Sequence, residues 1–489
     1  MLVRTAAAVA GITAVTASLI VANGASAEEA STPTPRIAWK DCNEPIFQGM
    51  DCGTMRVPID PSRPSTGTTQ LALVRRPADN QAERIGTMLM NNGPGSSSIE
   101  QLRYAMIGQL DKLGGSFTKR FDLLAVDPRG VGHSSPLRCD VPLKGRGITH
   151  FPATEAEFNA LKAHNKALAA NCREKNGPLA DHVDMASTAR DFEYVRRALG
   201  EKQLHWYGIT YSNLLGRTYA KLYPGRLRSM VLDTATNDGL PPVERMADEM
   251  RAAEDSFNRF AKWCGTSESC ALNGQDVAAV YDQLVKKANA EPIPIGTTGR
   301  FMNGEDIQTA TQGHLVMKLV TWGPFGKALK QAIDGDASLL SVDPDKTLDW
   351  TQAQIQACQD MPPAATNWRQ YANLKTMADE ISPHLGGAVQ SWTYMAGCLG
   401  WPGAAKHSPA SGPVNGAPPA LILQSTHESL AAYNSGFGLA AQLPGSQVLT
   451  NVGDDYTMYM ISPCVLENVD RYLADGTMPA PRATCATPS

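Results

Sequence analysis

The segment with the clearest chemical signature runs from Leu204 to Gly216 and reads LHWYGITYSNLLG. An apolar run, a glycine, a hydroxyl residue and a helix-like segment together predict a strand, a sharp turn and a helix. A hydroxyl on such a turn is well exposed and can attack a carbonyl carbon as a nucleophile. The usual pattern is G-x-S-x-G, whereas the five positions here are Gly208, Ile209, Thr210, Tyr211 and Ser212. Threonine therefore stands at the nucleophile position, and serine replaces the second glycine.

A glycine-rich turn upstream could contribute to the same site. It reads Asn92-Gly93-Pro94-Gly95 and follows the apolar run 87–90. Backbone N–H groups, here those of Gly93 and Tyr211, can bind the negative charge that develops on a carbonyl oxygen. The alternative interpretation is that Gly93-Pro94-Gly95 is only a turn.

Composition and charge narrow the classes of protein that fit. The 489 residues are 43% hydrophobic and 19% charged, with a net charge of −4, which is typical of a globular protein and does not indicate nucleic-acid binding.

Residues 1–27 combine Arg4, an apolar stretch and the site Ala25-Ser26-Ala27, which predicts a signal peptide cleaved near Ala27. The alternative is an uncleaved anchor. No later stretch is apolar enough to span a bilayer, so we expect a secreted protein without stable membrane insertion.

The ten cysteines indicate disulfides, because an exported chain folds in an oxidising compartment. Neighbouring cysteines suggest five pairs, although the sequence does not prove them. No CxxC pair or His-x-x-x-His accompanies them, so we expect neither a metal site nor a cofactor. The suggested pairs are Cys42–Cys52, Cys139–Cys172, Cys264–Cys270, Cys358–Cys398 and Cys464–Cys485.

Strand-like and helix-like runs alternate on both sides of a helix-rich middle. This rhythm predicts an α/β fold with a mostly parallel sheet covered on both faces. The middle is rich in helix-forming runs and poor in apolar strand runs, which predicts a large helical lid inserted in the sheet domain. The expected divisions are a flexible lead-in at 28–39, the first part of the sheet domain at 40–236, the lid at 237–417 and the C-terminal part of the sheet domain at 418–489.

Together these landmarks resemble the secreted actinobacterial α/β-hydrolases of the tripeptidyl aminopeptidase type, with their C-terminal domain. Asn92-Gly93-Pro94-Gly95 is similar to the family's Gly-Gly-Pro-Gly oxyanion loop, and residues 127–132 match its D-x-R-G-x-G segment. Residues 462–464 and 475–485 match the family's tail. The resemblance covers nearly all of the chain after the signal peptide, and it implies an α/β-hydrolase fold.

The resemblance also assigns three catalytic positions, and none carries the family's residue. The nucleophilic serine falls on Thr210. The acid follows a late strand in a segment like Q-G-T-x-D, which reads QSTHE here and places Glu428 at the acid position. The histidine lies eight residues before the Pro-Cys cysteine in a segment like G-x-G-H, which reads GDDY here and places Tyr456 at the base position.

These substitutions do not support ordinary serine-hydrolase chemistry. A base with a pKa near the working pH must take the hydroxyl proton, whereas the pKa of a tyrosine starts at about 10. The β-branch of Thr210 restricts its χ1 angle, and Ser212 adds a side chain where the helix packs on the strand. His427, beside Glu428, is a candidate alternative base; the other interpretation is a surface-loop histidine.

Three hypotheses about function remain. The first is an enzyme that performs non-hydrolytic acid–base chemistry, such as cyclisation, isomerisation or elimination, on a carbonyl-containing small molecule or peptide-like substrate, with secondary metabolism as one setting. In it Tyr456 would protonate and Glu428 would deprotonate, if burial raises the carboxyl's pKa. The second is a residual peptidase or esterase that uses Thr210. The third is a non-catalytic binding protein on a hydrolase scaffold. The sequence leaves the oligomeric state open.

Overall fold

The structure is a computed structural model that describes residues 35–486, except 92, 94, 108–115, 146, 238, 342–349, 362 and 404–411. The predicted signal peptide at 1–27 lies outside the described residues, as does most of the predicted lead-in at 28–39. Two residues of the predicted oxyanion loop, Asn92 and Pro94, also lie outside them.

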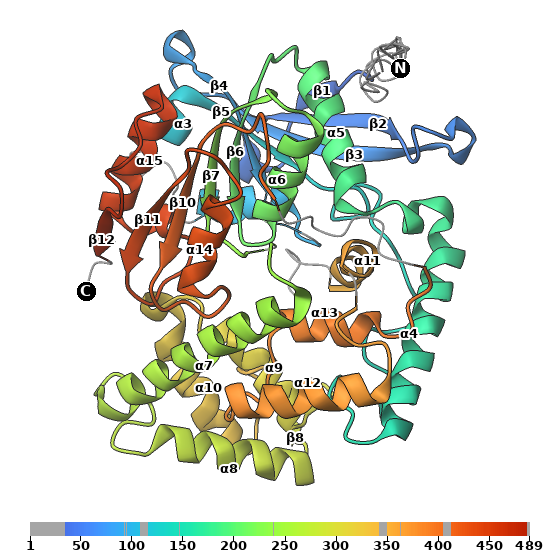
Figure 1. Cartoon of the computed structure of the whole chain (residues 1–489), viewed down its shortest axis with the longest axis vertical. Coiled ribbons are helices and arrows are strands. Elements are labelled where there is room, and N and C mark those ends of the chain that lie inside the picture. The colour runs from blue at the N-terminus through green and yellow to red at the C-terminus, as the bar shows by residue number, and fades with distance from the viewer. Residues whose placement is uncertain are drawn as a thin grey trace, which may run out of the picture. The chain divides into compact units, whose positions relative to one another are not determined.

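A ten-stranded sheet organises the described chain (Figure 1), in the order β1-β2-β3-β5-β4-β6-β7-β10-β11-β12. The pairs β1–β2, β2–β3 and β3–β5 are antiparallel, and every later pair is parallel. The predicted α/β-hydrolase fold with its mostly parallel sheet is therefore confirmed. The strands are Ala38–Asp41 (β1), Asp51–Pro58 (β2), Thr68–Arg76 (β3), Gly86–Asn91 (β4), Phe121–Val126 (β5), Leu204–Ile209 (β6), Leu227–Asp233 (β7), Ala420–Ser425 (β10), Gln447–Val452 (β11) and Thr484–Ala486 (β12).

Helices cover both faces of the parallel strands. Successive side chains of a strand point to opposite faces, and in β10 Ala420 and Ile422 pack with residues of α5 and α6, whereas Leu421 and Leu423 pack with residues of α15. Because both faces are covered, the central strands are continuous apolar runs rather than alternating ones. The helices of the sheet domain are Ser98–Ile107 (α2), Ser116–Arg120 (α3), Met185–Ala198 (α5), Ser212–Leu222 (α6), Tyr433–Ala440 (α14) and Pro463–Asp475 (α15).

The segment between β7 and β10 is largely helical. Its helices gather at one end of the sheet (Figure 1) and share a hydrophobic core of their own. They are Pro242–Thr266 (α7), Val277–Ala290 (α8), Gly304–His314 (α9), Gly323–Ile333 (α10), Trp350–Asp360 (α11), Trp368–Ile381 (α12) and Gln390–Cys398 (α13), with the hairpin Ile293–Pro294 (β8) and Phe301–Met302 (β9).

Helix α4 (Glu155–Asn176) precedes the Thr210 turn in the chain but packs with the lid. Phe158 and Leu161 belong to the hydrophobic core of the lid. Asn165 Nδ2 donates hydrogen bonds of 2.9 Å to the carbonyl oxygens of Ala396 and Leu399, at the end of α13. The sequence-based boundary at 236/237 therefore does not separate the two hydrophobic cores, because periodicity reveals an apolar stripe but not which element it faces.

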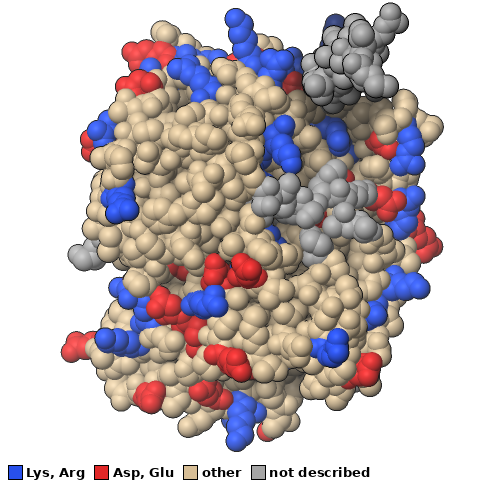
Figure 2. Space-filling view, viewed as in Figure 1, with Lys and Arg blue, Asp and Glu red and all other residues tan. Residues whose placement is uncertain are grey.

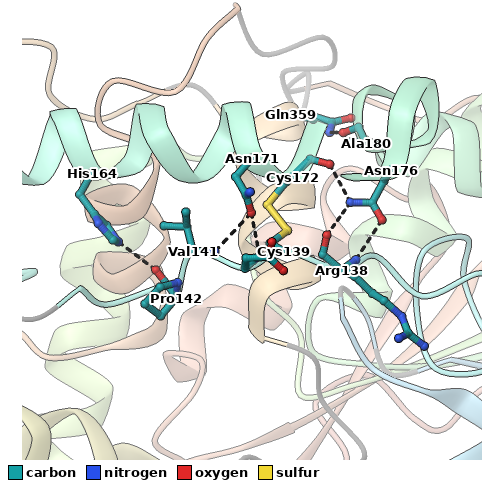
Figure 3. The surroundings of a disulfide bond; sticks show 11 residues. Arg138, Cys139, Val141, Pro142, His164, Asn171, Cys172, Asn176, Ala180 and Gln359 are labelled. Atoms are coloured by element: carbon teal, nitrogen blue, oxygen red, sulfur yellow. Dashed lines mark hydrogen bonds between the residues drawn. A yellow bond between two sulfur atoms is a disulfide. The ribbon is translucent and has the colours of Figure 1, made fainter. Parts of the chain in front are cut away.

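The cysteines of the described chain form the five predicted disulfides, and no free cysteine is left. The bond between Cys139 and Cys172 ties the segment after β5 to α4 (Figure 3). Side chains of α4 reinforce this attachment, since Asn171 Oδ1 accepts from the N–H of Asp140 and Asn176 Oδ1 accepts from the N–H of Arg138. The other bonds are Cys42–Cys52, Cys264–Cys270, Cys358–Cys398 and Cys464–Cys485.

Charged side chains are unevenly spread on the face seen in Figure 2. Acidic and basic groups are interspersed over the lid, whereas much of the sheet domain on this face carries few charges.

Within the described residues, no helix has the length and apolarity to cross a membrane. The same residues include no group of three or more His, Cys, Asp and Glu side chains arranged to hold a metal ion.

Candidate active site

Thr210 lies on a sharp turn between β6 and α6. Its φ of +50° falls in the left-handed region, which a β-branched residue rarely adopts. The turn is held by hydrogen bonds from Thr210 N–H to the carbonyl oxygen of Asp233 (3.0 Å) and from Asn213 N–H to the carbonyl oxygen of Thr210 (2.9 Å). A Cβ at Gly208 would lie 2.6 Å from Trp206 Nε1, so the approach to the turn requires glycine. This is the strand–turn–helix geometry predicted from the sequence.

Ser212, at the second glycine position of the turn, is fully buried. Its Oγ lies 2.9 Å from the place that a Cβ of Gly208 would take. This oxygen has no hydrogen-bond partner among the described residues, and a buried unpaired hydroxyl costs about 1–3 kcal/mol. The prediction that Ser212 places a side chain in the tight contact between helix and strand is confirmed.

Tyr456, in the loop after β11, reaches the turn and forms a side-chain hydrogen bond with Thr210. The Thr210 hydroxyl itself donates to the carbonyl oxygen of Ile209 at 2.8 Å. Burial raises the pKa of Tyr456 well above its usual value, and the nearby carboxyls of Asp233 and Glu428 raise this pKa further. Tyr456 is therefore a neutral phenol at physiological pH and cannot take the Thr210 proton.

Glu428 follows β10 and is almost completely buried, at 1% exposure. Burial raises the pKa of Glu428 to about 8, although backbone N–H groups such as that of Leu430, which donates to Oε2 at 3.1 Å, oppose this shift. The other carboxyl oxygen, Oε1, has no hydrogen-bond partner among the described residues. At neutral pH Glu428 is therefore mostly protonated, and it does not supply the negative charge that the acid of a catalytic triad supplies.

Asp233, at the end of β7, lies close enough to Tyr456 and Glu428 for its charge to raise the pKa of both. The sequence did not reveal it as a site residue. Its buried carboxylate accepts hydrogen bonds from the hydroxyl of Tyr207 (3.0 Å) and from the N–H groups of Met458 and Tyr459 (both 3.4 Å). Burial raises the pKa of Asp233 to about 6, so it is mostly ionised at neutral pH. The sequence feature that could have indicated Asp233 is its place as an acidic residue at the end of a buried parallel strand. The ends of such strands converge at one edge of the sheet.

Gly93 packs directly against the Thr210 turn, as an oxyanion loop would. A Cβ at Gly93, whose φ is +96°, would lie 2.9 Å from the Cβ of Tyr211 and 3.0 Å from the nitrogen of Ser212. However, the N–H of Gly93 donates to Asn91 Oδ1 at 2.9 Å. This N–H would have to leave Asn91 before it could stabilise a substrate oxygen. The oxyanion role of Gly93 and Tyr211 stays a prediction.

Comparisons with known proteins agree with this fold. A family model described as "TAP-like protein" matches residues 382–485. The tripeptidyl aminopeptidase of Streptomyces lividans is 28% identical over 491 aligned residues, which cover 95% of this chain and 89% of the relative. Carboxylesterase B of Mycobacterium tuberculosis is 30% identical over 484 aligned residues, which cover 92% of this chain and 90% of the relative. The chain belongs to the tripeptidyl aminopeptidase-like family of α/β-hydrolases.

A solved structure also aligns with this chain. Proline iminopeptidase of Mycobacterium smegmatis covers 86% of this chain and 98% of its own length, with a TM-score of 0.36 and 13% identity. At these values the alignment adds nothing to the family assignment, which rests on the sequences.

In this tripeptidyl aminopeptidase-like protein, the side chain of His427 pairs with helix α7 rather than with the Thr210 hydroxyl. Its Nδ1 pairs with Asp255 Oδ2 of α7 at 2.8 Å, and its side chain is 38% exposed. The His427 N–H donates to the carbonyl oxygen of Gly453. Among the described residues, the hydrogen-bond partners of the Thr210 hydroxyl are Ile209 and Tyr456. The surface-loop interpretation of His427 therefore fits better than the alternative base.

Proposed function

We propose that this tripeptidyl aminopeptidase-like protein is an exported enzyme that performs acid–base chemistry on a carbonyl-containing substrate without forming an acyl-enzyme. Cyclisation, isomerisation or elimination of a small molecule or peptide-like compound are reactions of this kind. The observation that carries the proposal is the buried cluster of Glu428, Asp233, Tyr456 and Thr210, which contains two carboxyls and a phenol but no imidazole.

The protonation states of the cluster support proton transfer at neutral pH. A general acid or base works best when its pKa lies near the working pH, and the pKa of Glu428, about 8, meets this condition. Tyr456 keeps its proton and can donate a hydrogen bond to a substrate carbonyl. Asp233 holds a negative charge beside them, which favours the protonated form of Glu428.

Hydrolysis through Thr210 is the second candidate, because relatives of the chain are named tripeptidyl aminopeptidase and carboxylesterase B. It requires a group that removes the Thr210 proton, and a neutral phenol is a poor acceptor for it. A binding protein without catalysis is the third candidate, and it requires none of the protonation states described above.

A fluorophosphonate probe separates the candidates, because it labels a hydroxyl that a neighbouring base activates. We expect the purified protein to be labelled no more than a Thr210→Ala variant. Strong labelling that disappears in Thr210→Ala would establish the hydrolase instead.

The acid–base role itself is tested by incubation with peptide amides and β-keto esters, followed by mass spectrometry. The expected products are isomeric with the substrate or lack water or ammonia. Their formation should stop in Glu428→Gln and Tyr456→Phe and continue in Thr210→Ala. Products from none of the compounds, with folded protein, would favour the binding protein.

A further inference from the structure

A pocket opens within the lid, between the first turn of α7, the segment after α11 and helix α13. Most of its wall is apolar. Three flexible methionines, Met246, Met361 and Met395, line it together with Pro242, Pro363 and Ala364. Methionine side chains adapt to irregular apolar shapes, so the wall suits an apolar ligand rather than a sugar or a nucleotide.

One cation lines this apolar pocket. Arg245 is partly buried, and its Nε is buried with no hydrogen-bond partner among the described residues. Its Nη2 donates to the sulfur of Met361 at 3.6 Å, and a thioether sulfur is only a weak acceptor. Arg245 also lies in the first turn of α7, where the helix dipole favours a negative charge. The guanidinium therefore lacks the anionic partner that a sheltered arginine normally has.

Glu249, one helical turn further along α7, feels the charge of Arg245, which opposes the rise that burial causes in the pKa of Glu249, but its hydrogen bonds are made elsewhere. Its carboxyl oxygens accept hydrogen bonds from Gln312 Nε2 (2.9 Å) and from the N–H groups of Gln390 (3.1 Å) and Ser391 (3.2 Å). No carboxylate of the described residues lies within 4.0 Å of the Arg245 guanidinium. The space beside Arg245 is therefore suited to an anion that comes from outside the chain.

We propose that this pocket binds a carboxylic acid with an apolar body, and that Arg245 is the partner of its carboxylate. The pocket adjoins the Thr210 turn through two aromatic rings. Tyr394 lines the pocket, and its ring stands edge-on to that of Tyr211, the residue after Thr210, at 5.8 Å. That this ligand is the substrate rests on the proposed function, whereas its binding does not.

Isothermal titration calorimetry with octanoate and octanamide tests the proposal on the full mature protein. The two probes share the apolar chain and differ in charge. We expect octanoate to bind about tenfold more tightly than octanamide, because a hydrogen-bonded charge pair is worth about that much. Arg245→Met should remove this preference and leave octanamide binding unchanged. Arg251→Met is the matched control, since Arg251 lies on the same helix with its side chain 59% exposed and pairs with Asp248.

Two further comparisons complete the test. N-acetyl-leucyl-leucine and its C-terminal amide show whether the carboxylate belongs to a peptide end or to a free acid, and preference for either acid supports the proposal. If Arg245→Met does not fold, the affinity of the wild type for octanoate should fall with added salt while that for octanamide does not. Equal binding of acids and amides by the wild type, or a preference that survives Arg245→Met, would overturn the proposal. Fluorophosphonate labelling of Thr210 would refute the proposed function and leave this result intact.

Discussion

Replacing Glu428 with glutamine should make the stability of the protein less dependent on pH above pH 6. The pKa of Glu428 is about 8 in the folded protein, against an ordinary value of 4.5. Between these two values the folded protein keeps a proton that the unfolded chain releases, so a rise in pH favours unfolding. The free energy of unfolding falls by about 1.4 kcal/mol per pH unit until the folded-state pKa is approached. Between pH 6 and pH 8 the wild type should therefore lose about 2 kcal/mol more than Glu428→Gln.

Urea unfolding at pH 6, 7 and 8, followed by tryptophan fluorescence, measures this difference. The window starts at pH 6 because the pKa of Asp233, about 6, lies there, so most of its own contribution falls at lower pH. Glu291→Gln is the control, since Glu291 is exposed at the end of α8, and it should follow the wild type. If the unfolding free energies of the wild type and Glu428→Gln run parallel from pH 6 to pH 8, Glu428 is ionised in the folded protein and the reasoning about the cluster is wrong.

Three other outcomes are expected. Thr210→Ser alone should change fluorophosphonate labelling little, whereas Thr210→Ser with Tyr456→His should raise it about 10²–10⁴-fold, as a general base does; the triple variant with Ser212→Gly controls for crowding, and no gain in either would contradict the assignment of the base position. Intact-mass measurement under non-reducing, denaturing conditions should give a chain that begins near Glu28 and takes up no alkylating reagent; uptake by two cysteines would refute complete disulfide bonding. Gly208→Ala should destabilise the protein by roughly 1–3 kcal/mol, because the new methyl group meets the buried indole beneath the turn, and an unchanged melting temperature would show that the contact relaxes.

Structural features that are determined by a short segment of the sequence could be predicted well. The turn at Thr210 follows from one glycine, one hydroxyl residue and the periodicity on either side, and its left-handed backbone is present. The five disulfides each join cysteines that neighbour one another in the sequence, so that their pairing follows chain order. The parallel strands were visible because both of their faces are buried, which makes them continuous apolar runs.

Features that depend on several distant segments could not be predicted. The carboxyl of Asp233 looks like any strand end until the loop that carries Met458 and Tyr459 folds over it. The protonation of Glu428 depends on burial, which no local pattern reports. The sequence does not distinguish Arg245 from the other charged residues of its helix. That its Nε has no hydrogen-bond partner among the described residues becomes clear in the structure, where α7 packs against α13 and the segment after α11.

The packing of α4 into the lid limits how this protein can be taken apart. A lid that is inserted at one point of a chain can be exchanged between relatives as a cassette. Here a graft of residues 237–417 would leave α4 behind, with Phe158 and Leu161 facing a foreign surface and Asn165 without the carbonyl groups of α13. Chimeras that exchange the lid should therefore carry α4 along with it. For the same reason, we expect changes in the lid to require matching changes in α4, although the Thr210 turn lies between them in the sequence.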